Sequence, residues 1–213
     1  MRFATVPFLA LLLLPVFAFA GPIEDGAAAF KNSDWPVAIG LLLPLAEQGN
    51  DEAQVYVGYM YEFGHGIEKD PAAALKWFRK SADRRNAEAQ FNVGYIYKRG
   101  LGVPQDDAKA LKWFRKAADQ GNGTAQFMLG GIYANGEGVK QDWQEAFFWF
   151  LLMPPEDSAV TREDHEAALS RIYAAHLTPE QIEAVKKRVH KWKPKSERAA
   201  PAKKDQALEL IRR

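Results

Sequence analysis

Histidines are the residues of this chain best suited to bind a metal ion or to transfer a proton at neutral pH. Their spacing supports neither role, because no two stand four residues apart on one helix face and no His-Glu-x-x-His motif occurs. The chain has no cysteine, which excludes thiolate metal sites and disulfides. We therefore predict no metal and no cofactor from the four histidines, which are His65, His165, His176 and His190.

The serines and the paired carboxylates also lack a catalytic setting. No serine stands in a Ser-x-x-Lys or Gly-x-Ser-x-Gly motif. Neighbouring acidic residues such as Asp106/Asp107 and Glu163/Asp164 fit a helix start and a solvated helix face. We expect no catalytic residue and predict that the protein is not an enzyme.

The N-terminus has the features of an export signal. Arg2 precedes an apolar stretch from Val6 to Phe19, and Ala18-Phe19-Ala20 is a small-x-small cleavage sequence. The stretch is interrupted by prolines and shorter than the ~20 residues of a spanning helix. We predict a signal peptide over residues 1–20, cleavage after Ala20 and a periplasmic or secreted protein. The alternative is an uncleaved membrane anchor.

The other end of the chain is strongly basic. Lys186 to Arg213 contain 11 lysine and arginine residues against three acidic ones. Three interpretations stay open: a solubilising disordered end, a weak contact with anionic membranes or envelope polysaccharide, and nucleic-acid binding. We expect no nucleic acid, since an exported protein rarely meets it.

The elements that must position any binding surface recur at intervals of 36 residues. Such a constant period indicates stacked repeats, in which each unit buries its apolar face against the next. The recurring groups are Ala53-Gln54, Ala89-Gln90 and Ala125-Gln126; Gly58, Gly94 and Gly130; Tyr61, Tyr97 and Tyr133; Asp70, Asp106 and Asp142; and Trp77, Trp113 and Trp149.

Each unit is predicted to be a pair of helices. Asn50 is a suitable N-cap for the first helix, and Asp70 followed by Pro71 is a suitable start for the second. A glycine inside a helix costs ~1 kcal/mol relative to alanine, so Gly58 suggests the close approach of a neighbouring helix. Arg85 stands where the other units have glycine, so its turn requires another geometry or a left-handed residue that is not glycine.

These signals predict an all-α protein with a repeat domain over residues 21–193. A partial repeat precedes the full repeats, two capping helices follow them because an open stack end must be covered, and the chain ends in a basic disordered tail. The predicted ranges are 24–50 for the partial repeat, 53–88, 89–124 and 125–153 for the full repeats, 159–192 for the capping helices and 194–213 for the tail.

The repeat units resemble the Sel-one-like repeat family, which is related to the tetratricopeptide repeats. The likeness is most specific in the runs 89–97, 100–106 and 110–121, which read AQFNVGYIY, GLGVPQD and ALKWFRKAADQG. The resemblance implies a right-handed α-solenoid with a tetratricopeptide-like superhelix. It also implies a non-enzymatic adaptor in the bacterial cell envelope.

By the same resemblance, the first helices line a concave groove that binds a protein partner, although the aromatics could instead only pack between repeats. A cell-wall-associated hydrolase or β-lactam-binding protein remains an alternative, as does an envelope polysaccharide or membrane tether acting through residues 186–213. The cysteine pairs of the β-lactam-related members are absent. The predicted groove residues are Val55, Tyr59, Glu62, Phe91, Asn92, Tyr95, Lys98 and Phe127.

Overall fold

The computed structural model describes residues 21–153 and 162–195, so the predicted signal peptide and residues 196–213 of the predicted tail lie outside the described residues. The described part contains ten α-helices, which follow the predicted pairs. They are α1 (Pro22–Lys31), α2 (Trp35–Glu47), α3 (Asp51–Phe63), α4 (Pro71–Asp83), α5 (Ala87–Arg99), α6 (Asp107–Asp119), α7 (Gly123–Asn135), α8 (Trp143–Leu152), α9 (Arg162–Tyr173) and α10 (Pro179–Lys191).

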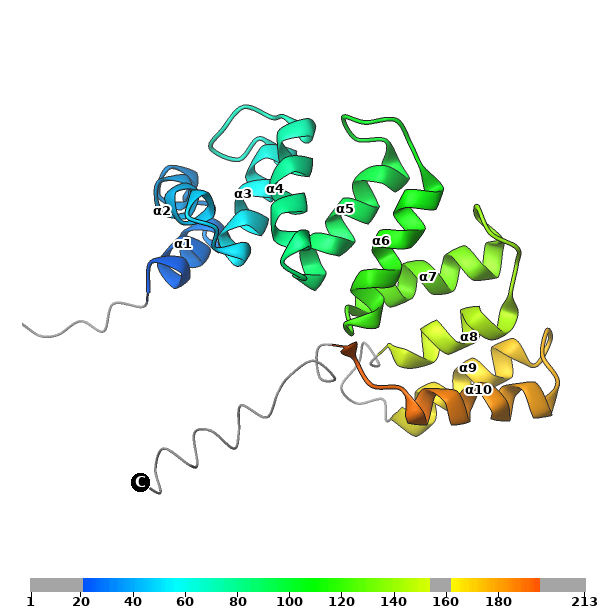
Figure 1. The fold of residues 1–213 in the computed structure, drawn as a ribbon. Coiled ribbons are helices and arrows are strands. Elements are labelled where there is room, and N and C mark those ends of the chain that lie inside the picture. The colour runs from blue at the N-terminus through cyan, green and yellow to red at the C-terminus, as the bar shows by residue number, and fades with distance from the viewer. Residues whose placement is uncertain (1–20, 154–161, 196–213) are drawn as a thin grey trace, which may run out of the picture.

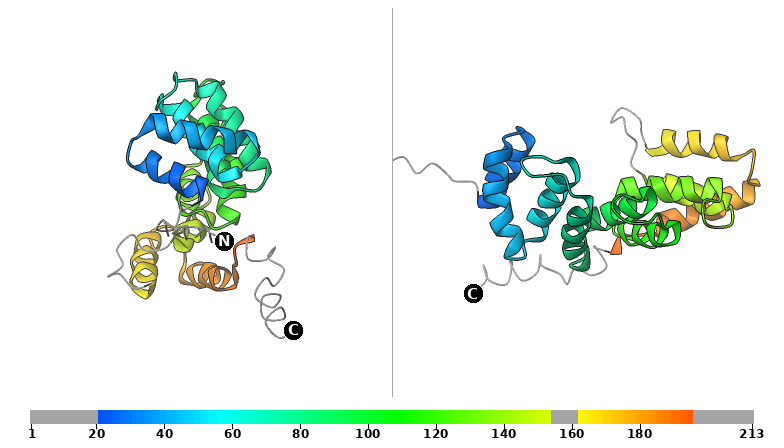
Figure 2. Two further views of the ribbon diagram at one scale, coloured as in Figure 1. Left: turned by 90° about the vertical axis from the view of Figure 1, so that its left-hand side faces the viewer. Right: turned by 90° about the horizontal axis from the view of Figure 1, so that it is seen from above.

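The helices stack in chain order along an arc (Figure 1). Each helix contacts the next one in sequence from α1 to α9, and α10 packs on α8. The long loops within the repeats lie along the outer rim, whereas the short turns between repeats lie at the inner edge (Figure 1). Figure 2 shows the same series from above, running from the N-terminal pair to α10. The prediction of an all-α, right-handed solenoid is confirmed.

The predicted caps fix where the helices begin. Asn50 accepts a hydrogen bond of 2.8 Å from the backbone N–H of Ala53, and Asn86 and Asn122 cap α5 and α7 in the same way. Asp70 accepts bonds from the backbone N–H groups of two residues in the first turn of α4. Each cap satisfies donors that the first helical turn leaves without partners. The residues that recur along the sequence therefore include those that fix where successive helices begin.

The turns use left-handed residues where the sequence suggested them. Arg85 has φ of +70°, so the second of the two predicted solutions for its turn is the one found. Gly102 has φ of +67°, and a Cβ there would lie 3.0 Å from the backbone nitrogen of Ala72 in the preceding repeat. Because glycine has no Cβ, this loop can pack against the start of α4.

Within each repeat, a glycine of the first helix faces a phenylalanine of the second. Phe78 and Phe114 are fully buried. A Cβ on Gly94 would lie 2.8 Å from the Phe114 ring, and one on Gly58 would lie 2.5 Å from the Phe78 ring. The glycine thus lets the two helices approach, as predicted for Gly58, and the packing offsets its low helix propensity.

Buried glutamines join each first helix to the repeat before it. The side-chain amide of Gln90 donates to the carbonyl of Ala82 at 3.2 Å, in the last turn of α4. Gln54 and Gln126 make the equivalent bonds to Ala46 and Ala118. Each of these carbonyls also accepts a backbone N–H of the turn that follows, so the glutamine uses its second lone pair, and the Ala-Gln pair of the repeat has a structural role.

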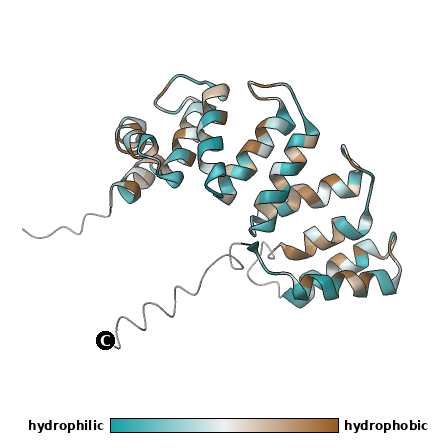
Figure 3. Ribbon diagram, viewed as in Figure 1, coloured by the Kyte–Doolittle hydropathy of each residue, from teal (hydrophilic) through white to brown (hydrophobic). Residues whose placement is uncertain are grey.

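The last pair of helices covers the open end of the stack. Ile182 and Val185 of α10 are buried, as is Trp149 of α8. Thr178 and Gln181 form the capping box at the start of α10. The first of the two predicted capping helices is described from Arg162, and its predicted residues 159–161 lie outside the described residues. Along the helices, hydrophobic and hydrophilic residues alternate, as expected of elements with one buried and one exposed side (Figure 3).

Candidate interaction surface

The predicted groove residues lie on the first helices of the repeats, α3, α5 and α7, but they differ in what they can offer a partner. Val55 is 3% exposed and Asn92 is 5% exposed. Neither side chain is available for recognition, so their assignment to the groove was wrong. Val55 lies in the core. The side-chain amide of Asn92 donates a hydrogen bond of 2.8 Å to the hydroxyl of Tyr59.

Tyr59 links two neighbouring repeats. Its hydroxyl also donates to Glu88 of α5 at 2.9 Å, and its ring packs edge-on against Phe78, with centroids 5.3 Å apart. Burial raises the pKa of the Tyr59 phenol, so the neutral donor is kept. Tyr59 therefore fills the seam between repeats, which is the alternative that the sequence left open for the aromatics.

The two charged residues of the predicted groove are partly covered. Lys98 donates to Glu137 of the next repeat at 2.6 Å and lies 3.4 Å from Asp107. Partial burial, the largest single effect, disfavours its charged form, but hydrogen bonds and charge attraction from Glu137 and Asp107 together outweigh it, so the pKa of Lys98 is raised. Glu62 is half-buried, and this burial raises the pKa of its carboxyl. Lys98 thus acts as a connection between repeats at this surface.

The exposed aromatics form the part of this face that a partner could contact. Phe127 is 52% exposed, and Phe63, one turn after Tyr59 on α3, is 56% exposed. Phe91 and Tyr95 stack at 6.2 Å and are half-buried, with Phe91 also resting on Phe114. Sequence reasoning missed Phe63, although its spacing of four residues from Tyr59 places both on one helix row.

The histidines have structural contacts. The imidazole of His65 stacks on the indole of Trp35 at 4.1 Å, and His176 stacks on Trp143 at 3.8 Å. His190 contacts the backbone carbonyl of Lys186. Within residues 21–153 and 162–195 no group of three or more acidic or histidine side chains is placed to hold a metal ion. In the same ranges no helix has the length and apolar character needed to cross a bilayer.

The Lys98–Glu137 contact predicts a pH dependence of stability. Hydrogen bonds from Lys98 and Asn135 lower the pKa of Glu137 below its ordinary value of 4.5. A carboxylate with a lowered folded-state pKa stabilises the fold above its unfolded pKa, and this contribution is lost as pH falls through the folded-state pKa. We expect Glu137→Gln to reduce the free energy of unfolding at pH 7 by a fraction of ~1 kcal/mol, because the side chain is 40% exposed and screened by solvent.

Urea denaturation of both proteins between pH 7 and pH 3 measures this difference. The gap between wild type and Glu137→Gln should shrink as pH falls below 4.5. Asp83→Asn is a suitable control, because Asp83 is exposed at the end of α4. A gap that persists unchanged at pH 3 would show that the substitution acts by some route other than the ion pair.

Comparisons with known proteins agree with this architecture. The sequence model of the Sel1 repeat matches residues 51–86, 87–122 and 123–153, so each matched unit starts at the first residue of its first helix. The crystal structure of a Sel1 repeat protein from Oxalobacter formigenes is similar, with 30% identity and a TM-score of 0.62 over 72% of this chain and 60% of that one.

A second solved structure is c5321, a protective antigen present in uropathogenic Escherichia coli strains that displays an SLR fold. It has 32% identity and a TM-score of 0.61 over 78% of this chain. The present chain spans 60% and 36% of the lengths of these two proteins. The comparison with curated proteins finds no match.

Sel1 repeats are generally non-catalytic scaffolds for protein–protein interaction. From its three matched repeats and its solenoid of helix pairs, the chain belongs to the Sel1 repeat family.

Proposed function

We propose that this protein is an exported adaptor of the bacterial cell envelope, which binds a segment of a protein partner on the face formed by α3, α5 and α7. The observation that supports this surface most directly is the exposure of Phe63 and Phe127, each more than half open to solvent. Aromatic side chains are common as anchors in protein interfaces.

The half-buried stack of Phe91 and Tyr95 lies on α5, between the helices that contain these two anchors. A partner helix or extended segment laid across the first helices would cover apolar surface at each repeat, and only the side chains of that segment would need to adapt. The rigid repeats would be preorganised for it, which lowers the entropic cost of binding.

The proposal of export is based on the sequence of residues 1–20, in which Ala18-Phe19-Ala20 precedes the predicted cleavage site.

The absence of cysteine from the chain allows a site-specific test. Phe127→Cys and Phe63→Cys, each labelled with a photo-activated cross-linker, should form a discrete product with a partner in envelope extracts. The captured chain should begin at Gly21. The matched control is Ile172→Cys, because Ile172 is 64% exposed but lies on α9, outside the proposed surface.

Phe63→Ser and Phe127→Ser together should then reduce recovery of that partner by roughly tenfold or more, as expected for loss of aromatic anchors. Circular dichroism should show unchanged helix content, since both side chains are exposed. The same product from position 172, no product from positions 63 and 127, or a captured chain that still begins at Met1 would each contradict the proposal.

A further inference from the structure

A basic pocket lies at the C-terminal end of the solenoid, between α6, α8 and α10. It has a volume of about 540 Å³ and is lined mainly by α10 and the residues that follow it, together with α6 and α8, so it lies on elements other than the proposed partner surface. Six of its lining residues are cationic and one, Asp119, is acidic. The cationic residues are Arg115, Lys187, Arg188, Lys191, Lys193 and Lys195.

Part of this positive charge is already used to hold carboxylates of the chain itself. Arg188 contacts Glu145 at 2.5 Å, and Arg115 contacts the other oxygen of the same carboxylate at 3.5 Å. Lys195 pairs with Asp119. Three of the six cations are therefore already paired with carboxylates of the chain.

The remaining lysines of the pocket, Lys187, Lys191 and Lys193, have no acidic partner within the described residues. Lys187 and Lys191 are exposed and one helical turn apart, so they share a face of α10. The indole Nε1 of Trp149, also in the wall, is buried and lacks an acceptor within the described residues. Three lysines without an acidic partner thus gather at one place, and an acceptor-only ligand such as a carboxylate complements their ammonium groups.

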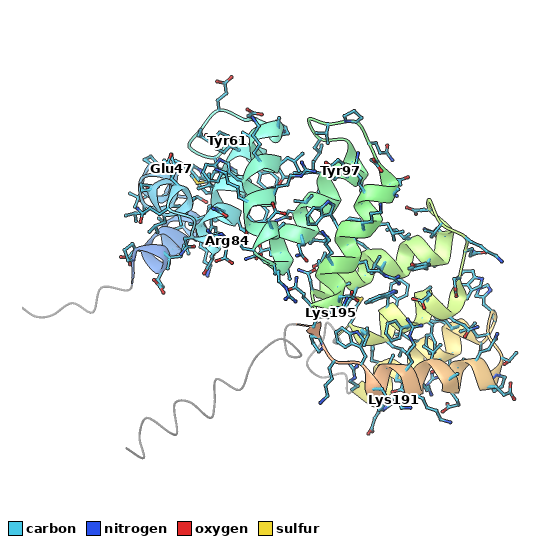
Figure 4. All side chains as sticks on the ribbon, viewed as in Figure 1. Glu47, Tyr61, Arg84, Tyr97, Lys191 and Lys195 are labelled. Carbon is cyan, nitrogen blue, oxygen red and sulfur yellow. The ribbon has the colours of Figure 1, made fainter. Side chains whose placement is uncertain are left out.

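The pocket continues along the inner edge of the arc. A second pocket of about 300 Å³ shares Asp119 and Lys195 with the first and adds two cations, Arg85 and Lys116, and one acidic residue, Asp83. Figure 4 shows Lys195 at the inner edge near the end of α6, with Lys191 farther along α10. The hydrophilic segment that follows α10 borders this region (Figure 3). Because the two pockets share two lining residues, they lie next to each other, and together we call them the basic groove. Their combined extent suits a chain-like ligand more than a small ion.

We propose that this basic groove binds an acidic peptide segment of a protein partner, at a site separate from the aromatic surface of α3, α5 and α7. Glutamate and aspartate side chains of the segment would pair with Lys187, Lys191 and Lys193, as Glu145 and Asp119 already pair with their neighbours. Steering by the clustered positive charge would speed the encounter.

Fluorescence anisotropy of the full-length chain with fluorescein-labelled hexaglutamate tests this proposal. Binding should be salt-sensitive, and Lys187→Glu/Lys191→Glu should weaken it by roughly tenfold or more. The control is Lys76→Glu/Lys112→Glu, which changes the net charge equally at exposed lysines outside both pockets and should alter binding by about twofold or less. Equal weakening by the two double variants, or by neither, would overturn the assignment of the groove.

Competition with other anions tests the chemical class of the ligand. Hexagalacturonate has as many carboxylates as hexaglutamate but fixes them on sugar rings, and vesicles containing phosphatidylglycerol present phosphates on a surface. We expect hexaglutamate to bind most tightly, since its flexible side chains can reach lysines on different walls. Tighter binding of either competitor would overturn the choice of a peptide. Cross-linking at Phe127 is a separate measurement, so failure here does not affect the proposed adaptor surface.

Discussion

Replacing Phe114 with alanine is expected to lower the free energy of unfolding by about 3–5 kcal/mol, the usual cost of removing a buried aromatic ring from a core. Phe114 is fully buried in α6, contacts the ring of Phe91 and closes over Gly94 of α5. The repeat that contains it lies in the middle of the stack, so its loss also weakens both neighbouring interfaces. Since a domain of this size has ~5–15 kcal/mol of stability in total, the variant should be near its unfolding threshold.

Urea denaturation followed by circular dichroism measures this effect. Phe127→Ala is the matched control, because it removes the same side chain from a position that is 52% exposed. The control should cost about 1 kcal/mol or less, since little apolar surface returns to water there. A larger loss for Phe127→Ala than for Phe114→Ala would show that the assignment of buried and exposed aromatics is reversed.

Gly94→Ala is expected to destabilise the protein by about 1–2 kcal/mol, even though alanine is the better helix former. The new Cβ would lie 2.8 Å from two atoms of the Phe114 ring and 3.2 Å from the carbonyl oxygen of Ala110. A fully buried ring and a helix backbone have little room to retreat, so overpacking outweighs the ~1 kcal/mol gained in helix propensity. The expected result is a lower urea midpoint with an unchanged slope.

Gly131 of α7 gives the opposite outcome for the same chemical change. A Cβ there meets no atom within 4 Å, so Gly131→Ala should stabilise the protein by about 1 kcal/mol.

A double-mutant cycle tests whether the contact with Phe114 causes the destabilisation by Gly94→Ala. In a Phe114→Ala background the obstacle at Gly94 is removed, and Gly94→Ala should become close to neutral. If Gly94→Ala costs the same in both backgrounds, the contact with Phe114 is not the cause.

The predicted surface shows where reasoning from the sequence reached its limit. A helix row tells which residues share a direction, because side chains three and four positions apart lie on one face. The row does not tell which neighbouring side chains cover that face of the helix. Val55 and Tyr59 stand on one row, but Val55 is enclosed in the core whereas Tyr59 reaches Glu88 of the next repeat.

The basic groove could be predicted only in part. The excess of lysine and arginine from Lys186 onward was visible in the sequence, but it left open a solubilising tail, a contact with membrane or polysaccharide, and nucleic-acid binding. The structure brings Lys195 beside Asp119 and places Arg188 against Glu145, contacts that join residues 76 and 43 positions apart. Which cations stay unpaired depends on these distant neighbours.

By itself, the sequence determined the helix pairs, their caps and the serial stack, since capping residues, glycine turns and apolar periodicity act over a few residues and recur every 36. Tertiary structure alone decided which side chains remain accessible, because burial depends on the curvature of the stack and on side chains contributed by the adjacent repeat. Phe91 and Phe127 occupy the same position in successive repeats, yet one is half-buried and the other more than half exposed.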